Sequence, residues 1–245
     1  MAKPKVGAQL IIWGKRIDTD LLGVLDEVAE LGYAGVEMSP AQLEKYSDPR
    51  ALFSSRNLSL IGLHMGVGDL KLVDAALKLL RRAEGHYLLF SGAGGRGNTE
   101  QEYRQNSRFL QDVGKRAKEY GVRVCYHNHA QEIINNAMGM KIVCEETDPE
   151  LVSLCVDTFW FQYGGLSPVE FIKENLDRVA YLHLKDMRDR EFVELGQGVI
   201  DFPAVIKAVK PIALEWAVVE QDRTKRTPKE SMEISRRYLK EKLGL

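Results

Sequence analysis

Short apolar runs alternate with amphipathic segments along almost the whole chain. Residues 6–13 form the first apolar run and predict a strand. The next segment, 21–31, repeats leucine and valine at spacings of three and four, which is typical of a helix. Asp18 or Asp20 would cap this helix and Gly32 would end it. The first unit is therefore a strand followed by a helix.

The same unit recurs through the chain. Seven further strands are expected over residues 34–38, 58–65, 86–90, 122–127, 152–157, 179–184 and 212–220. Helical patterns follow at 72–80, 100–120, 168–176, 202–209 and 228–243, while the connection over 132–150 is poorly defined. The pattern thus gives eight strands alternating with helices.

Eight such units predict right-handed βαβ connections and a parallel sheet covered by helices. A closed (β/α)8 TIM barrel is favoured over an open doubly wound sheet, because open sheets usually have fewer strands and no GxGxxG follows the first strand. No linker or low-complexity tract divides the chain. We expect an α/β protein in which residues 1–245 form one TIM-barrel domain.

Composition narrows the class of protein. The formal net charge of -1 gives no global attraction to nucleic acid, and the three cysteines follow no CxxC spacing. No apolar stretch approaches the ~18 residues of a membrane span, and the start shows no signal-peptide pattern. We expect a cytoplasmic protein without nucleic-acid or membrane partners.

Ionisable residues gather where the predicted strands end. Seven lie at or just after a carboxyl end: Glu37, His64, His127, His129, Asp157, His183 and Glu220. In a barrel of parallel strands these ends converge on one mouth, where such folds place their active sites. His86 instead begins a strand and belongs to the opposite face. The sequence therefore predicts one cluster built from distant segments.

This cluster has the donor types of a metal site. His127 and His129 are two residues apart, so a continuing strand would point both to one face and Asn128 away. Imidazole nitrogens together with the oxygens of Asp157 and Glu220 suit zinc, manganese or cobalt. A purely structural role would bury several ionisable groups, each costing several kcal/mol if unpaired. A metal centre explains the set better.

Other features near the strand ends are less specific. Trp160 could form an apolar wall against a sugar face, although such aromatic residues often only pack. Asp186 and Asp222 follow the strand-end residues and are expected to cap or hold loops. The glycine-rich segment 91–97 could offer backbone N–H groups to an anion, but it matches no P-loop. The segment 195–202 is either a substrate-facing loop or a turn ending in an N-cap at Asp201.

With these residues in view, the chain resembles the xylose isomerase-like TIM-barrel superfamily. The resemblance rests on GYAGVEMSP, GLHMG, YHNH, LCVDT, YLHLKD, LGQGVIDF and VVEQD, which follow in the family's order and cover essentially the whole chain. Its branch of sugar isomerases and epimerases includes tagatose epimerases, inosose dehydratases and endonuclease IV. The resemblance implies the same barrel and a sugar or polyol as substrate.

The resemblance also implies a ligand set. Asp157, His183 and Glu220 match the family's metal ligands on strands six, seven and eight, and His127 stands where the epimerases have a glutamate. His129 or Glu132 remains an alternative fourth ligand. A standard epimerisation with two glutamates is therefore in doubt, whereas inosose dehydratases resemble this chain more closely in having consecutive histidines there.

The nuclease alternative fits less well. Its trinuclear site needs a histidine where this chain has Trp160, and an aspartate and a histidine where it has Arg190 and Phe192.

The leading hypothesis is an isomerase or epimerase that uses one divalent ion (Mn, Zn, Co or Mg) to activate a ketose or keto-polyol. Glu220 or His129 would take the proton next to the carbonyl, while His64, Glu37 and Lys185 orient hydroxyls and Lys185 stabilises oxyanion charge. An inosose dehydratase-like lyase shares this first step and is the alternative. A sugar-binding barrel without chemistry is a third possibility. Members of this branch are often dimers or tetramers, so a homo-oligomer is a further expectation.

Overall fold

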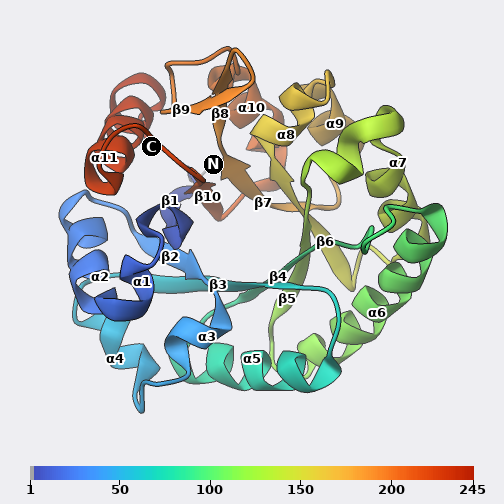
Figure 1. Ribbon diagram of the computed structural model, residues 1–245, viewed down its shortest axis with the longest axis horizontal. Coiled ribbons are helices and arrows are strands. Elements are labelled where there is room, and N and C mark those ends of the chain that lie inside the picture. The colour runs from blue at the N-terminus through green and yellow to red at the C-terminus, as the bar shows by residue number, and fades with distance from the viewer. Residues whose placement is uncertain (1–2) are drawn as a thin grey trace.

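The computed structural model describes residues 3–245, in which eight parallel strands close into a barrel (Figure 1). β1 pairs with both β2 and β10, and Lys5 lies opposite Trp216 where the barrel closes. The barrel strands are β1 (Lys5–Gln9), β2 (Gly35–Met38), β3 (Ser59–Gly66), β4 (Tyr87–Ser91), β5 (Arg123–His127), β6 (Val152–Asp157), β7 (Val179–Leu184) and β10 (Trp216–Val219). The (β/α)8 barrel predicted from the sequence is confirmed.

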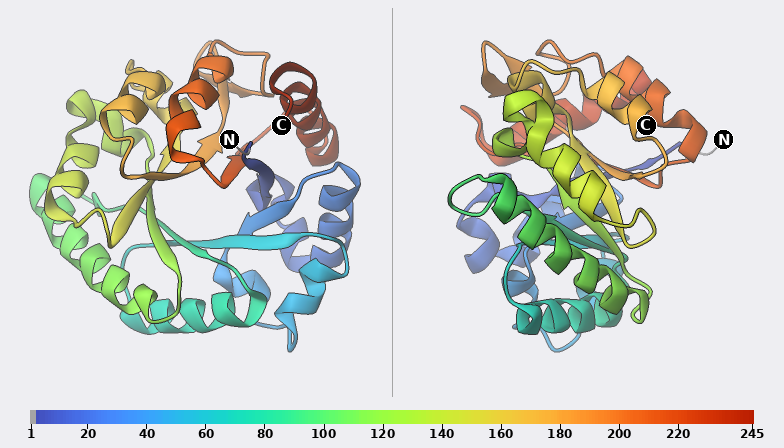
Figure 2. Two further views of the ribbon diagram at one scale, coloured as in Figure 1. Left: turned by 180° about the vertical axis from the view of Figure 1, so that it is seen from behind. Right: turned by 90° about the vertical axis from the view of Figure 1, so that its right-hand side faces the viewer.

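Helices surround the strands on the outside (Figure 2). They are α1 (Arg16–Thr19), α2 (Leu21–Glu30), α3 (Pro40–Leu43), α4 (Pro49–Ser54), α5 (Leu70–Ala83), α6 (Glu100–Lys118), α7 (Ala130–Glu146), α8 (Thr158–Tyr163), α9 (Pro168–Glu174), α10 (Phe202–Val209) and α11 (Pro228–Tyr238). Side-chain caps begin several of them, as Asp20 does for α2 and Asp201 for α10. None of the helices within residues 3–245 has the length and apolar character needed to cross a bilayer.

The barrel interior below the mouth is an apolar plug. Ile61, Leu89, Cys125, Cys155 and Tyr181 belong to one buried cluster that is separate from the larger core beneath the helices. Three of these residues lie two positions before a strand-end histidine or aspartate, so they share its inward face. The charged residues at the strand ends therefore lie directly above an apolar layer. Leaving a charge unpaired next to this layer would cost free energy of folding.

Two strands are shorter than the sequence predicts. The first strand ends at Gln9, because residues Leu10–Trp13 turn into a 3-10 helix whose start is capped by the Gln9 side chain. The last strand begins at Trp216, because Lys210–Ile212 form another 3-10 turn and Ala213 has a left-handed φ of 48°. An apolar run could not distinguish a strand from such a turn.

The poorly defined connection over 132–150 is mostly helix α7. This helix is broken at Ile134–Ala137, where three residues have positive φ, and the break explains why no single helical period runs through it. The structure also adds a short antiparallel hairpin, β8 (Asp186–Arg188) and β9 (Glu191–Val193), that the sequence did not indicate. The hairpin extends the connection after β7.

Candidate active site

Four side chains from the second half of the barrel meet at its mouth. His127 ends β5, Asp157 ends β6, His183 lies on β7 and Glu220 directly follows β10. All four are buried, and one potential ligand atom from each lies within 4.8 Å of the others. The tertiary structure thus brings together the four residues that the sequence proposed as metal ligands.

Asp157 presents one carboxylate oxygen to this cluster. Its Oδ1 accepts hydrogen bonds from the backbone N–H of Phe159 (2.8 Å) and Trp160 (3.4 Å) and so caps α8. Its Oδ2 lies 3.3 Å from His127 Nε2. The Asn128 side chain accepts from the Asp157 N–H (2.9 Å) and donates to the Asp157 carbonyl (3.3 Å). These bonds hold Asp157 with its Oδ2 directed into the cluster, where it contacts His127 and Lys185.

His183 lies between two carboxylates. Its Nδ1 is 2.8 Å from Glu220 Oε2, and its Nε2 is 2.8 Å from Glu37 Oε2. Burial opposes ionisation of Glu37, yet the nearby His183 lowers the pKa of Glu37 to about 2. Glu37 lies on β2, so this histidine links the two halves of the barrel.

Lys185 supplies a buried positive charge to the cluster. Its Nζ lies 3.1 Å from Asp157 Oδ2, 3.1 Å from Glu220 Oε2 and 3.2 Å from both oxygens of Asp222. Burial alone would lower the pKa of this lysine, but the carboxylates of Asp157, Glu220 and Asp222 outweigh it and raise the pKa. Lys185 is therefore a cation that neutralises the carboxylates around it.

Asp222 and Asp186 were both expected from the sequence to cap or hold loops, and Asp222 instead belongs to the site. Its carboxylate binds Lys185 and lines the cavity at the mouth. Asp222 lies two positions after Glu220, a spacing that places two side chains on the same face of a strand. Because β10 ends at Val219, this rule does not apply to Asp222, and its position could not be inferred from the sequence. Asp186 does hold a loop as expected, since it accepts hydrogen bonds from four backbone N–H groups at positions 187, 196, 198 and 200.

His129 lies in the site, but not as part of a continuing strand β5, as the sequence suggested. β5 ends at His127, and His129 is instead the N-cap residue of α7, with its ring centroid 4.7 Å from that of His127. Burial and the nearby His127 lower the pKa of His129 to about 2. Glu132 accepts hydrogen bonds from the Tyr126 hydroxyl and the His129 N–H, both at 2.8 Å. Glu132 is not part of the four-residue cluster.

The charges of the cluster balance one another. Burial opposes ionisation of Glu220, yet Lys185 and His183 hold its pKa well below the ordinary value. Burial also disfavours the charged form of His127, but Asp157 and Glu220 raise its pKa. Such a network binds positive charge tightly, whether protons or a metal ion.

The donor set fits a divalent ion. Two imidazoles and two carboxylates are the ligands that zinc, manganese and cobalt accept. His127 Nδ1 is buried and has no hydrogen-bond partner among residues 3–245. The ring is therefore hydrogen-bonded only through its other nitrogen, Nε2, which faces Asp157. Magnesium, which prefers an all-oxygen shell, fits these residues less well.

A cavity of about 580 Å³ opens above the cluster. Of the residues that the sequence proposed for catalysis or substrate binding, Glu220, His129 and His64 line it, whereas Lys185, Glu37 and Trp160 lie outside its lining. Apart from Asp222, the remaining wall comes from the first half of the barrel and includes Gln9, Ile11, Lys15, Met38, Gln42 and Ser91. The cavity has the volume needed for a small ligand.

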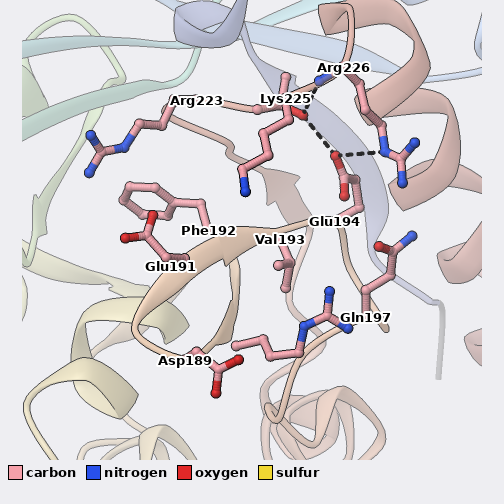
Figure 3. Close-up of a pocket in the computed structure, with 11 residues that line it drawn as sticks. Asp189, Glu191, Phe192, Val193, Glu194, Gln197, Arg223, Lys225 and Arg226 are labelled. Atoms are coloured by element: carbon pink, nitrogen blue, oxygen red, sulfur yellow. Dashed lines mark hydrogen bonds and ion pairs between the residues drawn. The ribbon is translucent and has the colours of Figure 1, made fainter.

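A second cavity of about 520 Å³ lies against the β8–β9 hairpin (Figure 3). Its lining includes Phe192, Glu194, Arg223 and Arg226, and Glu194 pairs with Arg226 at 3.5 Å. Phe192 separates it from the site, since its ring lies 5.8 Å from that of Trp160 and 5.5 Å from Lys185 Nζ. None of the four clustered residues lines this second cavity.

Comparisons with known proteins agree with this architecture. The chain is similar to an inosose dehydratase of Geobacillus kaustophilus, with 28% identity over 81% of this chain and 79% of that protein. It is 31% identical to inosose dehydratase 2 of Bacillus cereus, over 60% of this chain and 57% of that protein.

Two solved structures share the fold. A sugar phosphate isomerase/epimerase from Parabacteroides distasonis superposes with a TM-score of 0.82 at 20% identity, covering 98% of this chain and 94% of that one. The IOLI protein, solved with a zinc atom, gives a TM-score of 0.74 at 19% identity and covers 96% of both chains.

A family model described as the xylose isomerase-like TIM barrel matches residues 25–242, which include all four clustered residues. The chain therefore belongs to the xylose isomerase-like TIM barrel family.

Proposed function

We propose that this protein is a metal-dependent enzyme that removes water from a small keto sugar or keto-cyclitol. The observation that carries the proposal is the set of four buried donors, His127, Asp157, His183 and Glu220, lying directly beneath a cavity lined by acid–base side chains. Similarity to proteins named inosose dehydratase supports this choice of reaction.

The four donors would hold one divalent ion, and His127 is our choice for the strand-five ligand because neither His129 nor Glu132 is in the cluster. The ion, when bound, would supply Lewis-acid polarisation of the substrate carbonyl. Zinc, manganese and cobalt all suit the donors, and the structural relative with a zinc atom makes zinc a sound first probe.

Two side chains in the cavity wall can move the proton next to the carbonyl. Glu220 is held ionised by Lys185 and His183, and His129 is neutral at ordinary pH. A carboxylate and a neutral imidazole can each accept a proton. We propose Glu220 or His129 as the base, and the group that has taken the α proton then delivers it to the departing hydroxyl.

The elimination balances without another reagent. The base takes the α proton, the electron pair of that C–H bond forms a C=C bond, and the β C–O bond breaks. The hydroxyl leaves as water with the proton that the base took from carbon. Lys185 lies outside the cavity lining, so its positive charge would act through Asp157 and Glu220, which its Nζ contacts at 3.1 Å, and would keep Glu220 ionised as a base.

Other residues would position the substrate. His64 reaches the cavity, where its Nε2 lies 3.2 Å from Ser91 Oγ, and can orient a hydroxyl. Trp160 lies outside the cavity lining, with its ring 5.8 Å from that of His129, and would support that ring rather than contact the substrate.

Isomerisation or epimerisation is the second candidate, because it begins with the same proton removal and both Glu220 and His129 face the cavity. We favour dehydration for two reasons. Strand five carries His127 in place of a second carboxylate base, and Glu132 already accepts two hydrogen bonds.

One incubation separates the two reactions. The zinc-loaded protein is mixed with an inosose in deuterated water, and the products are followed by mass spectrometry and NMR. Dehydration gives a product lighter by one water, whereas isomerisation or epimerisation gives a product of unchanged formula carrying deuterium at carbon. A substrate that neither loses water nor exchanges a C–H proton, tested with zinc, manganese and cobalt in turn, would count against both.

A further inference from the structure

Glu37 is buried beneath the cavity rather than exposed to it. It lies on β2, has no accessible surface and is absent from the cavity lining, although the sequence suggested that it orients substrate hydroxyls. In this conformation its carboxylate contacts other side chains and cannot reach a ligand in the cavity.

Each oxygen of this carboxylate faces a different histidine. Oε2 is in hydrogen-bond contact with His183 Nε2 at 2.8 Å, whereas Oε1 lies 3.3 Å from His64 Nδ1 but has no hydrogen-bond partner among residues 3–245. His183 points its other nitrogen, Nδ1, toward Glu220 and the donor cluster. His64 points its other nitrogen toward Ser91 and the cavity.

An imidazole ring is rigid, and its two nitrogens diverge. A hydrogen bond that fixes Nε2–H therefore also fixes the direction of the Nδ1 lone pair and the tautomer of the ring. Metal-binding histidines commonly donate their second N–H to a carboxylate in this way, which orients the ring and raises its basicity as a ligand.

A purely stabilising role accounts poorly for the arrangement. Burying an ionised carboxylate beside imidazoles is weak evidence for stability, since well-packed apolar residues in its place are often neutral or stabilising. Orientation of His183 gives the buried charge a function that an apolar residue could not serve.

We propose that Glu37 is a positioning residue, which sets the ring orientation and tautomer of His183 for metal binding through the contact between its Oε2 and His183 Nε2. The inference rests on the proposed function in one respect, because it takes the four-residue cluster to be the metal site.

The first test measures zinc affinity by competition with a chromophoric chelator. Glu37→Gln keeps the size of the side chain and removes its charge, and we expect it to weaken zinc binding about 10- to 100-fold. His64→Gln is the matched control, because it removes the other histidine near Glu37 and leaves the contact with His183. Its zinc affinity should stay within about threefold of wild type, which is a smaller change than the loss of at least about tenfold expected for Glu37→Gln.

The second test does not depend on activity. In zinc-loaded protein labelled with ¹⁵N-histidine, wild type should show a slowly exchanging His183 Nε2–H proton with Nδ1 bound to zinc. In Glu37→Gln this proton should exchange faster and move upfield, because a charge-assisted hydrogen bond has been replaced by a weaker neutral one. Should Glu37→Gln fail to fold, Glu37→Asp, which retracts the charge by one methylene, is measured in the same two ways.

The outcomes separate this inference from the function on which it rests. Zinc binding by wild type, with unchanged affinity and an unchanged Nε2–H signal in the Glu37 variant, would overturn the positioning role alone. A wild-type protein that binds no divalent ion would overturn the proposed metal site and, with it, this role.

Discussion

The two halves of the barrel mouth carry different chemistry. β5, β6, β7 and the end of β10 supply the four clustered donors together with Lys185, and all of these are buried. β2, β3 and β4 supply Glu37, His64 and Ser91, none of which belongs to a donor cluster found within residues 3–245. One half concentrates charge, and the other half supports it and shapes the cavity.

The difference suggests a division of labour. In the second half, Asp157 and Glu220 are bound by His127, His183 and Lys185, so removing one member leaves others uncompensated. In the first half, His64 contacts Ser91 and both residues line the cavity. Substituting either of them should change contacts with a ligand but leave the ion pairs of the cluster intact. Apart from Glu37, which contacts His183, variants in the two halves should therefore separate metal binding from substrate handling.

The largest effect is expected from Glu220→Ala in the second half. Loss of a proposed ligand and base should lower turnover by about 10²- to 10⁴-fold and also weaken zinc binding. Steady-state kinetics and chelator competition measure both. Glu215→Ala is the matched control, because this exposed carboxylate lies at the other end of β10 and should leave turnover unchanged. Full activity in Glu220→Ala would refute its assignment.

Lys185→Met should give the next largest effect, on stability. The substitution leaves three carboxylates around a buried position without their cation, which should lower the free energy of unfolding of the metal-free protein by about 3–5 kcal/mol. Zinc should restore part of this loss, because it returns positive charge to the cluster. Urea denaturation with and without zinc tests the prediction.

Lys229→Met provides the comparison for Lys185→Met. Its ion pair with Glu30 at 2.7 Å is exposed, so its loss should change the free energy of unfolding far less than the loss of Lys185. Equal denaturation midpoints for the two lysine variants would mean that burial of Lys185 in the cluster has no special energetic consequence.

Asn128→Ala should have an intermediate effect on stability. The amide satisfies both the N–H and the carbonyl of Asp157 inside the protein, and leaving buried groups unpaired costs about 1–3 kcal/mol. Zinc affinity should fall as well, because Asp157 loses the contacts that hold it. A denaturation midpoint and a zinc affinity equal to those of wild type would show that capping of α8 alone positions this carboxylate.

The smallest effect is expected from His64→Gln in the first half. Losing one hydrogen bond to substrate should reduce kcat/KM by about tenfold, while zinc affinity changes little. His86→Gln tests the opposite face of the barrel, where an exposed histidine precedes β4 and should have no effect on kinetics. If His64→Gln lowers zinc affinity as strongly as Glu220→Ala does, the two halves are not functionally separate.

Errors in the sequence prediction fell where local patterns are ambiguous. The apolar run 6–13 contains both β1 and a 3-10 helix, because burial alone selects apolar residues for either structure. Helix α7 was not predicted, because its break at Ile134–Ala137 interrupts the helical period of apolar residues. The short β8–β9 hairpin has only three residues in each strand, too few for a pattern to stand out.

The sequence by itself determined the eight-fold alternation and the strand ends at which histidines and carboxylates gather. Both follow from local periodicity, which depends on near neighbours along the chain. Only the tertiary structure decided how these groups pair: that Glu37 contacts His183, residues 146 positions apart, and that Lys185 lies among Asp157, Glu220 and Asp222. Such pairings depend on barrel closure and strand register, which bring side chains into contact without leaving a periodic trace in the sequence.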